Sequence, residues 1–157
     1  MRTENWSKFL FLDVDGVLNT APDRIGSIND AKLRLVFEIH KQTGCGVVII
    51  SSWRYTTHQL QRIIGSLLRE ISSDYISCVP VIQSLDGLAL NNRKTIEILD
   101  WFVLARNANE SNSVILDDYV FPGALGRMQI SISSDTGLNE SIASKVIQKF
   151  HAESKED

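Results

Sequence analysis

Short, uniformly apolar runs alternate along the chain with longer segments in which apolar residues recur every three or four positions. A run that is apolar throughout is typical of a strand buried on both faces of a parallel sheet, whereas the longer spacing is typical of a helix packed on that sheet. The predicted strands cover residues 9–12, 46–50, 75–82, 113–116 and 128–132. The predicted helices cover residues 29–43, 57–71, 93–107 and 139–151.

This alternation predicts the fold class. Strands that alternate with helices favour right-handed crossovers, and therefore an α/β fold in which a mostly parallel central sheet lies between two helix layers. Either Ser27 or Asn29 is expected to cap the first helix, and Gly44 to end it. Pro80 is expected to place the third strand at a sheet edge. In the helix over residues 93–107, the expected buried stripe consists of Ile96, Leu99, Val103 and Leu104.

Length and composition restrict the classes of protein. The 157 residues suit one domain over 1–157, with 150–157 as a frayed tail, and contents of 43% hydrophobic and 22% charged residues are those of a soluble globular protein. A net charge of -3 argues against a broad surface for nucleic acid or acidic membranes. No signal peptide, membrane span or cysteine metal motif is recognisable, so we expect a cytoplasmic protein without a membrane partner.

Two aspartates stand where the first apolar run ends. Side chains alternate along a strand, so Asp13 and Asp15 are expected on one side of the chain while Val14 points into the protein, and Gly16 allows the backbone to turn away. Two neighbouring carboxylates repel each other, which favours a bound cation. The alternative is a hairpin turn, which needs only one of the two aspartates.

Two other strands also end in polar residues. Ser51 and Ser52 follow the second strand, and Asp117 and Asp118 follow the fourth. Because ligands of parallel α/β sheets bind at the carboxyl ends of the strands, these residues are candidates for one site. The alternative for each pair is a helix cap or a strand-end position that has no ligand.

Four segments in order, FLDVDGVLN, VVIISS, a basic pair opening a later helix, and VILDD, resemble the motifs of the haloacid dehalogenase (HAD) superfamily of phosphohydrolases. The resemblance extends from Phe9 to about Leu138. It implies a Rossmann-like HAD core, a three-layer sandwich. It also implies that Asp13 is the nucleophile that forms an aspartyl-phosphate, and that Asp15 protonates the leaving oxygen and then activates water.

The resemblance assigns the phosphate contacts to polar residues of the second and third motifs. Ser51 would hydrogen-bond a phosphoryl oxygen, although Ser52 could exchange roles with it, and Lys94 is preferred over Arg93 as the cation. Arg54 is either a phosphate ligand or a surface residue. Gly16 and Arg93 complete the substrate-binding candidates, and Trp53, beside the second motif, is a candidate for substrate contact.

The implied cofactor is Mg²⁺. Its ligands would be Asp13, the backbone carbonyl of Asp15, Asp117 and Asp118, an oxygen-only set that suits a hard cation. The metal would offset the charge of the nucleophile and of the phosphate.

The intervals between the motifs leave no room for a folded cap domain, so the site is expected to be open or covered by another chain. The segments SSWR, EILDW and TGL are similar to those of HAD domains associated with RNA repair. The leading hypothesis is a Mg²⁺-dependent phosphomonoesterase for phosphorylated substrates that include RNA or DNA ends. The alternatives are a nucleotide or metabolite phosphatase with a partner-supplied lid, and a non-catalytic phosphate-binding module.

Overall fold

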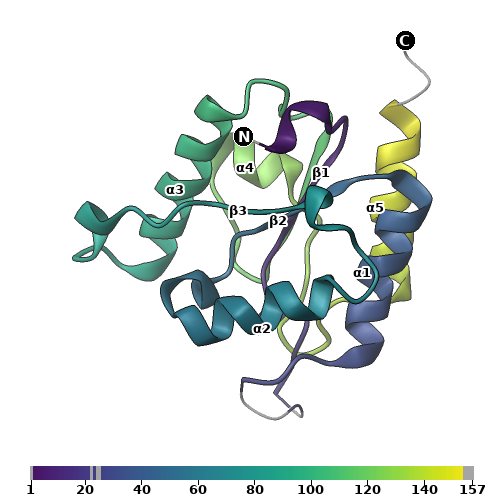
Figure 1. The fold of residues 1–157 in the computed structure, drawn as a ribbon, viewed down its shortest axis with the longest axis horizontal. Coiled ribbons are helices and arrows are strands. Elements are labelled where there is room, and N and C mark those ends of the chain that lie inside the picture. Colours follow the sequence, from purple (N-terminus) through teal and green to yellow (C-terminus); the bar gives the residue numbers. More distant parts are fainter. Residues whose placement is uncertain (1, 22, 24–25, 154–157) are drawn as a thin grey trace.

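The structure is a computed structural model, and it describes residues 2–21, 23 and 26–153. Its sheet contains the strands β1 (Phe9–Leu12), β2 (Gly46–Ile49), β3 (Ile76–Cys78) and β4 (Ser113–Leu116), in the order β3-β2-β1-β4 (Figure 1). Every pairing is parallel, and Leu12 is in register with both Ile49 and Leu116. The carboxyl ends of β2, β1 and β4 therefore lie at the same end of the sheet.

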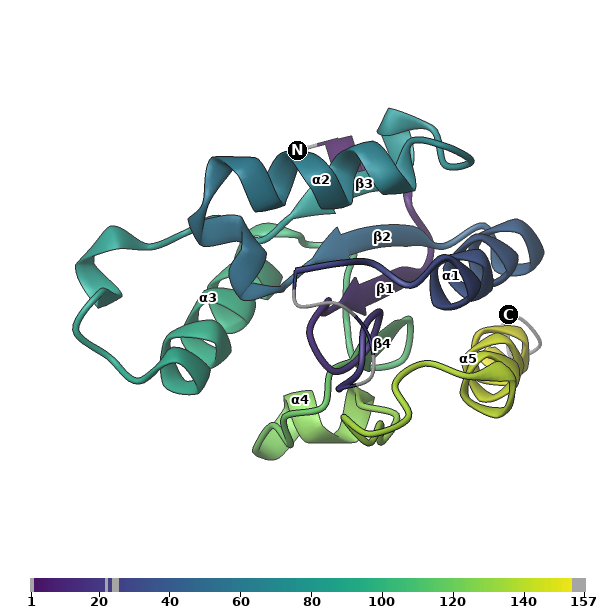
Figure 2. The same cartoon turned by 90° about the horizontal axis from the view of Figure 1, so that it is seen from below.

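Helices cover both faces of the sheet, as predicted. The helices α1 (Asp30–Thr43), α2 (Thr57–Leu67) and α5 (Glu140–Glu153) pack on one face, and α3 (Leu90–Leu104) and α4 (Gly123–Met128) pack on the other (Figure 2). Side-chain alternation in β1 supplies both cores, because Leu10 and Leu12 join the first and Phe9 and Phe11 the second. The three-layer α/β prediction is confirmed.

The first helix has the predicted ends. The Asn29 side chain accepts hydrogen bonds from the backbone N–H groups of Ala31 and Lys32, and Gly44 adopts the left-handed conformation at the carboxyl end. Local signals were sufficient here because a capping side chain and a glycine act on their own helix.

The predicted last strand over residues 128–132 is wrong. Residues Gly123–Met128 form α4, and an isolated bridge between Ile115 and Gln129 joins the segment after α4 to β4. The Gln129 side chain explains the difference, because its amide nitrogen donates to the carbonyls of Asp117 and Tyr119 while its oxygen accepts from the Phe121 N–H. The segment thus supports the loop after β4 with a side chain.

The predicted orientation of α3 is also wrong. Its buried residues are Lys94, Glu97, Ile98 and Trp101. The predicted stripe of Ile96, Leu99, Val103 and Leu104 is exposed. Apolar spacing was misleading because two charged side chains have partners inside the protein, and those partners set the rotation of the helix.

The structure also limits what lies around this core. Helix α5 continues to Glu153 with Phe150 fully buried, so a frayed tail does not begin at residue 150, and residues 154–157 lie outside the described part. The intervals between the motif strands contain no separate cap domain among the described residues. In that part of the chain, no helix combines the length and apolar character needed to cross a membrane.

Candidate active site

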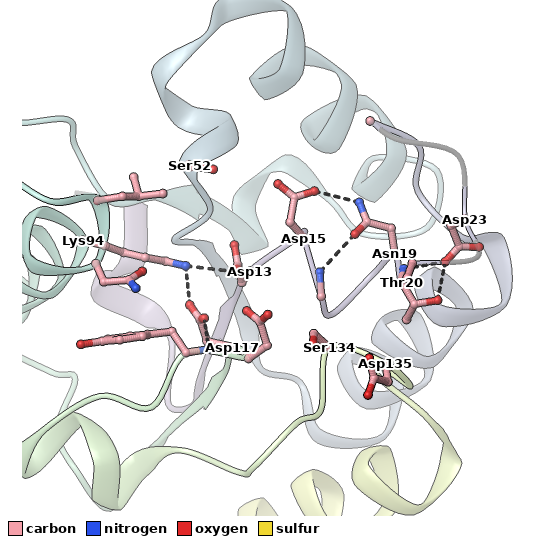
Figure 3. A pocket seen from close by; sticks show the side chains of 17 residues that line it. Asp13, Asp15, Asn19, Thr20, Asp23, Ser52, Lys94, Asp117, Ser134 and Asp135 are labelled. Atoms are coloured by element: carbon pink, nitrogen blue, oxygen red, sulfur yellow. Dashed lines mark hydrogen bonds and ion pairs between the residues drawn. The ribbon is translucent and has the colours of Figure 1, made fainter.

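A cavity of about 430 Å³ lies at the carboxyl ends of the strands. The motif residues that line it are Asp13, Asp15, Gly16, Ser52, Lys94, Asp117 and Asp118. Its wall is completed by Asn19, Thr20, Ala21, Asp23, Gly26, Leu90, Asn91, Tyr119, Ser134 and Asp135. Segments that are far apart in the sequence thus meet at the edge where the sheet topology predicts a ligand site (Figure 3).

Lys94 lies between two buried carboxylates. Its Nζ is 3.1 Å from Asp13 Oδ2 and forms a second ion pair with Asp117 (Figure 3). Burial acts to lower the pKa of Lys94, but the attraction of Asp13 and Asp117 outweighs it and raises the pKa above its ordinary value. Lys94 is therefore held as a cation beside the predicted nucleophile, in the place predicted for it in preference to Arg93.

The acidic pair after β4 is poorly compensated. Burial and the charge of Asp13 raise the pKa of Asp117 to about 7, and Lys94 offsets only part of this effect. Burial and Asp13 also raise the pKa of Asp118. Several carboxylates around one lysine leave an excess of negative charge, which a divalent cation would neutralise.

Three of the predicted metal ligands converge. Asp13, Asp117 and Asp118 each offer a carboxylate oxygen, and these oxygens lie within 4.8 Å of one another. Oxygen-only, carboxylate-rich surroundings suit Mg²⁺. Gly16 leaves room for this arrangement, because it has φ +77° and a Cβ at this position would collide with the Asp118 carboxylate. The residues present therefore fit a Mg²⁺ ion.

Asp15 lies at the mouth of the cavity, with its side chain held from two sides. The Asn19 amide donates to Oδ1 at 2.9 Å, and the Trp53 indole N–H donates to Oδ2 at 3.0 Å. Neither role was predicted, although Asn19 is part of the DVDGVLN segment. Trp53 is 1% exposed and does not line the cavity, so its contact is with Asp15 and not with the substrate.

The two serines differ in position. Ser51 is fully buried, and its hydroxyl oxygen accepts a hydrogen bond from the Trp53 backbone N–H at 3.3 Å, at the start of the 3₁₀ helix Ser52–Tyr55. Ser52 lines the cavity. The structure therefore places Ser51 in the capping role, which was its alternative, and brings Ser52 to the site.

Arg54 and Arg93 do not line the cavity, in contrast to their predicted role as substrate ligands. The guanidinium of Arg54 donates to Glu97, at 2.9 Å, and to the backbone carbonyls of Ile50, Ser51, Val79 and Pro80. Arg93 pairs with the same Glu97 carboxylate and lies over the Tyr55 ring. Both arginines therefore bind the buried acid Glu97 and do not reach the cavity.

Comparison with known proteins identifies one family. The family model described as "HAD domain in Swiss Army Knife RNA repair proteins" matches residues 9–143. No curated protein and no solved structure matches the chain. The match covers all four motif segments and the strands and helices that position them.

Proposed function

The chain belongs to the family of HAD domains found in Swiss Army Knife RNA repair proteins, and on this basis we propose that it is a Mg²⁺-dependent phosphomonoesterase with an aspartyl-phosphate intermediate. The observation that carries the proposal is the position of Lys94, which forms ion pairs with both Asp13 and Asp117. Carboxylate oxygens of Asp13, Asp117 and Asp118 also lie within 4.8 Å of one another, so a cation bound there would add to the neutralisation of Asp13. An aspartate held in this way can approach a phosphate dianion without prohibitive repulsion.

The reaction takes place in two steps. In the first, a carboxylate oxygen of Asp13 forms a bond to phosphorus, the ester P–O bond breaks, and protonated Asp15 gives its proton to the leaving oxygen. In the second, Asp15 removes a proton from water, the water oxygen bonds to phosphorus, and the bond to Asp13 breaks, which releases phosphate. A bound Mg²⁺ supplies charge neutralisation to both steps.

The proposed substrates are the phosphorylated ends of RNA or DNA. The family description supports this class of substrate. No cap domain covers the cavity among the described residues, so the end of a polymer can enter it. The net charge of -3 weighs against a long track along the phosphate backbone, so recognition would be limited to the terminal phosphate and its nearest nucleotides.

The test is Mg²⁺-dependent phosphate release by the wild type and by Asp13→Asn. The substrates are para-nitrophenyl phosphate, mononucleotides, a phosphopeptide, and RNA and DNA oligomers with a 5′- or 3′-phosphate. We expect turnover that is abolished both by chelation and by Asp13→Asn, with the highest kcat/KM on an oligomer. Acid-quenched enzyme should carry phosphate on Asp13 in the wild type.

Other outcomes would redirect the proposal. A preference for mononucleotides that increases with enzyme concentration would favour a metabolite phosphatase with a lid from a second chain. Absence of turnover on every substrate, together with Mg²⁺ and phosphate binding by calorimetry, would contradict the phosphatase and favour a phosphate-binding module.

A further inference from the structure

The Asp15 side chain is exposed, yet both of its carboxylate oxygens are held by the protein. Figure 3 shows the bond from Asn19 at one oxygen. The other oxygen accepts a hydrogen bond from the indole N–H of Trp53, a residue that does not line the cavity. We propose that Trp53 is a positioning residue, whose indole N–H orients Asp15 for proton transfer to the leaving group. This inference rests on the proposed phosphatase function.

Trp53 is an unusually well-fixed donor. Its ring belongs to the core formed with β1, β2, α1, α2 and α5, and its backbone N–H is bound by Ser51. The guanidinium carbon of Arg62, from α2, lies 5.8 Å from the centre of the indole ring. An indole held from several elements defines one position for its N–H, so an acceptor bound to it acquires that position too.

Asn19 holds the other oxygen from the loop that follows Asp15. Its amide nitrogen also donates to the Ser27 carbonyl at 3.1 Å, and its oxygen accepts from the Gly16 N–H, also at 3.1 Å. Asn19 therefore belongs to the same turn as Asp15 and would move with it. Trp53 is the donor that ties this turn to the second motif and to the core.

The two bonds orient Asp15 without preventing proton transfer. Each carboxylate oxygen has two lone pairs, so an oxygen that accepts one hydrogen bond can still carry a proton on the other lone pair. General acid catalysis needs the proton within hydrogen-bond reach of the leaving oxygen, and it contributes about 10²–10⁴-fold. A freely rotating Asp15 would lose part of that contribution.

Loss of the Trp53 donor should therefore depend on the leaving group. Phenolate is a poor leaving group that needs the proton, whereas para-nitrophenolate leaves readily without it. For Trp53→Phe, we expect kcat/KM to fall at least about tenfold on phenyl phosphate and less than about threefold on para-nitrophenyl phosphate. The constant kcat/KM is the appropriate readout because it covers the steps up to and including cleavage of the ester bond and excludes the later hydrolysis of the aspartyl-phosphate.

Trp101→Phe is the matched control. Trp101 is also fully buried and lies in the core on the other side of the sheet, and its indole nitrogen has no hydrogen-bond partner among the described residues. The same substitution there removes similar volume but no bond to an active-site residue. It should lower stability without changing the ratio of the two kcat/KM values.

A second pair of measurements keeps the test valid if Trp53→Phe folds poorly. Replacement of Trp53 by 3-benzothienylalanine removes only the N–H and should reproduce the leaving-group dependence. In ¹H–¹⁵N spectra of the wild type, the Trp53 indole resonance should move upfield on Asp15→Ala, whereas the Trp101 resonance stays in place.

Equal loss on the two phosphates, or an equal change of the ratio in Trp101→Phe, would overturn the positioning role while leaving the phosphatase intact. An unchanged Trp53 indole resonance in Asp15→Ala would overturn the contact itself. A wild type without turnover on any substrate would overturn the proposed function, and the positioning role with it.

Discussion

Helix α3 contributes charged side chains to two groups of ion pairs, and the two groups differ in how fully their charges are paired. The site cluster consists of Asp13, Lys94 and Asp117, and the Glu97 cluster consists of Arg54, Arg93 and Glu97. Lys94 and Arg93 are adjacent in the sequence and chemically similar. One faces the cavity and the other does not.

The Glu97 cluster is saturated. Glu97 Oε1 accepts from the Ile82 N–H and Arg93, and Oε2 accepts from Arg54 and the Tyr55 hydroxyl. Burial acts to raise the pKa of Glu97, but these donors outweigh it and lower the pKa. Two cations therefore surround one anion that has no further need of a ligand.

The site cluster is unsaturated. Its single lysine faces two buried carboxylates, Asp118 lies nearby, and the pKa of Asp117 is raised to about 7. Burial of charge therefore does not by itself identify a functional site. A surplus of one sign, facing a cavity, is what indicates that a ligand is required.

The largest expected effect separates the two adjacent cations. Lys94→Gln should lower kcat/KM by about 10³-fold, because the nucleophile and the phosphate lose their fixed positive charge. Arg93→Gln is the control and should change kcat/KM less than about threefold, with a loss of about 1 kcal/mol in stability, because its side chain is on the edge of the Glu97 cluster. Steady-state kinetics at saturating Mg²⁺ would measure both. Similar losses of kcat/KM in the two variants would contradict the assignment of Lys94 to the active site and of Arg93 to a structural cluster.

Replacement of Glu97, the acid at the centre of its cluster, should reduce stability and leave kcat/KM nearly unchanged. Glu97→Gln should lower the free energy of unfolding by about 3 kcal/mol, because Arg54 is left as a buried cation without its partner. Urea unfolding followed by circular dichroism measures this change. The folded fraction should retain near wild-type kcat/KM. An unchanged urea midpoint would show that the Glu97 cluster contributes little to stability.

Asp117→Asn tests the surplus charge directly. Because the folded-state pKa of about 7 lies above that of an unfolded aspartate, the stability contributed by protonated Asp117 is present below about pH 4 and lost as the pH rises through 7. Without metal at about pH 8, the free energy of unfolding of the variant should therefore be about 2 kcal/mol higher than that of the wild type. At about pH 4 this difference should vanish.

Urea titrations in chelator at several pH values provide this measurement. Addition of Mg²⁺ at about 100 times its dissociation constant should stabilise the wild type by about 2.7 kcal/mol and the variant by less. A wild type that is the more stable protein at high pH without metal would contradict the surplus of negative charge.

The smallest expected effect distinguishes two neighbouring serines, one that lines the cavity and one that caps a helix. Ser52→Ala should lower kcat/KM about tenfold, because its hydroxyl faces the cavity and can donate to a phosphoryl oxygen. Ser51→Ala should instead lower stability by about 1 kcal/mol, because it removes the cap on Trp53, and should change kcat/KM much less. If Ser51→Ala lowers the kcat/KM of the folded protein more than Ser52→Ala does, then Ser51 and not Ser52 contacts the phosphoryl oxygen.

Sequence alone determined the parts of the molecule that depend on short-range signals. Continuous apolar runs located β1, β2 and β4, and the position of polar residues directly after those strands brought Asp13, Asp15, Asp117 and Asp118 to one edge. This works because parallel strands in register carry their carboxyl ends to the same place.

Only the tertiary structure decided which polar side chains face the cavity. The rotation of α3, the capping role of Ser51, the withdrawal of Arg54 and the bonds that hold Asp15 each depend on a partner distant in sequence, such as Glu97 for Arg54 or Trp53 for Asp15. Buried polar groups must find hydrogen-bond partners, and the spacing of residues along the chain does not contain the identity of those partners.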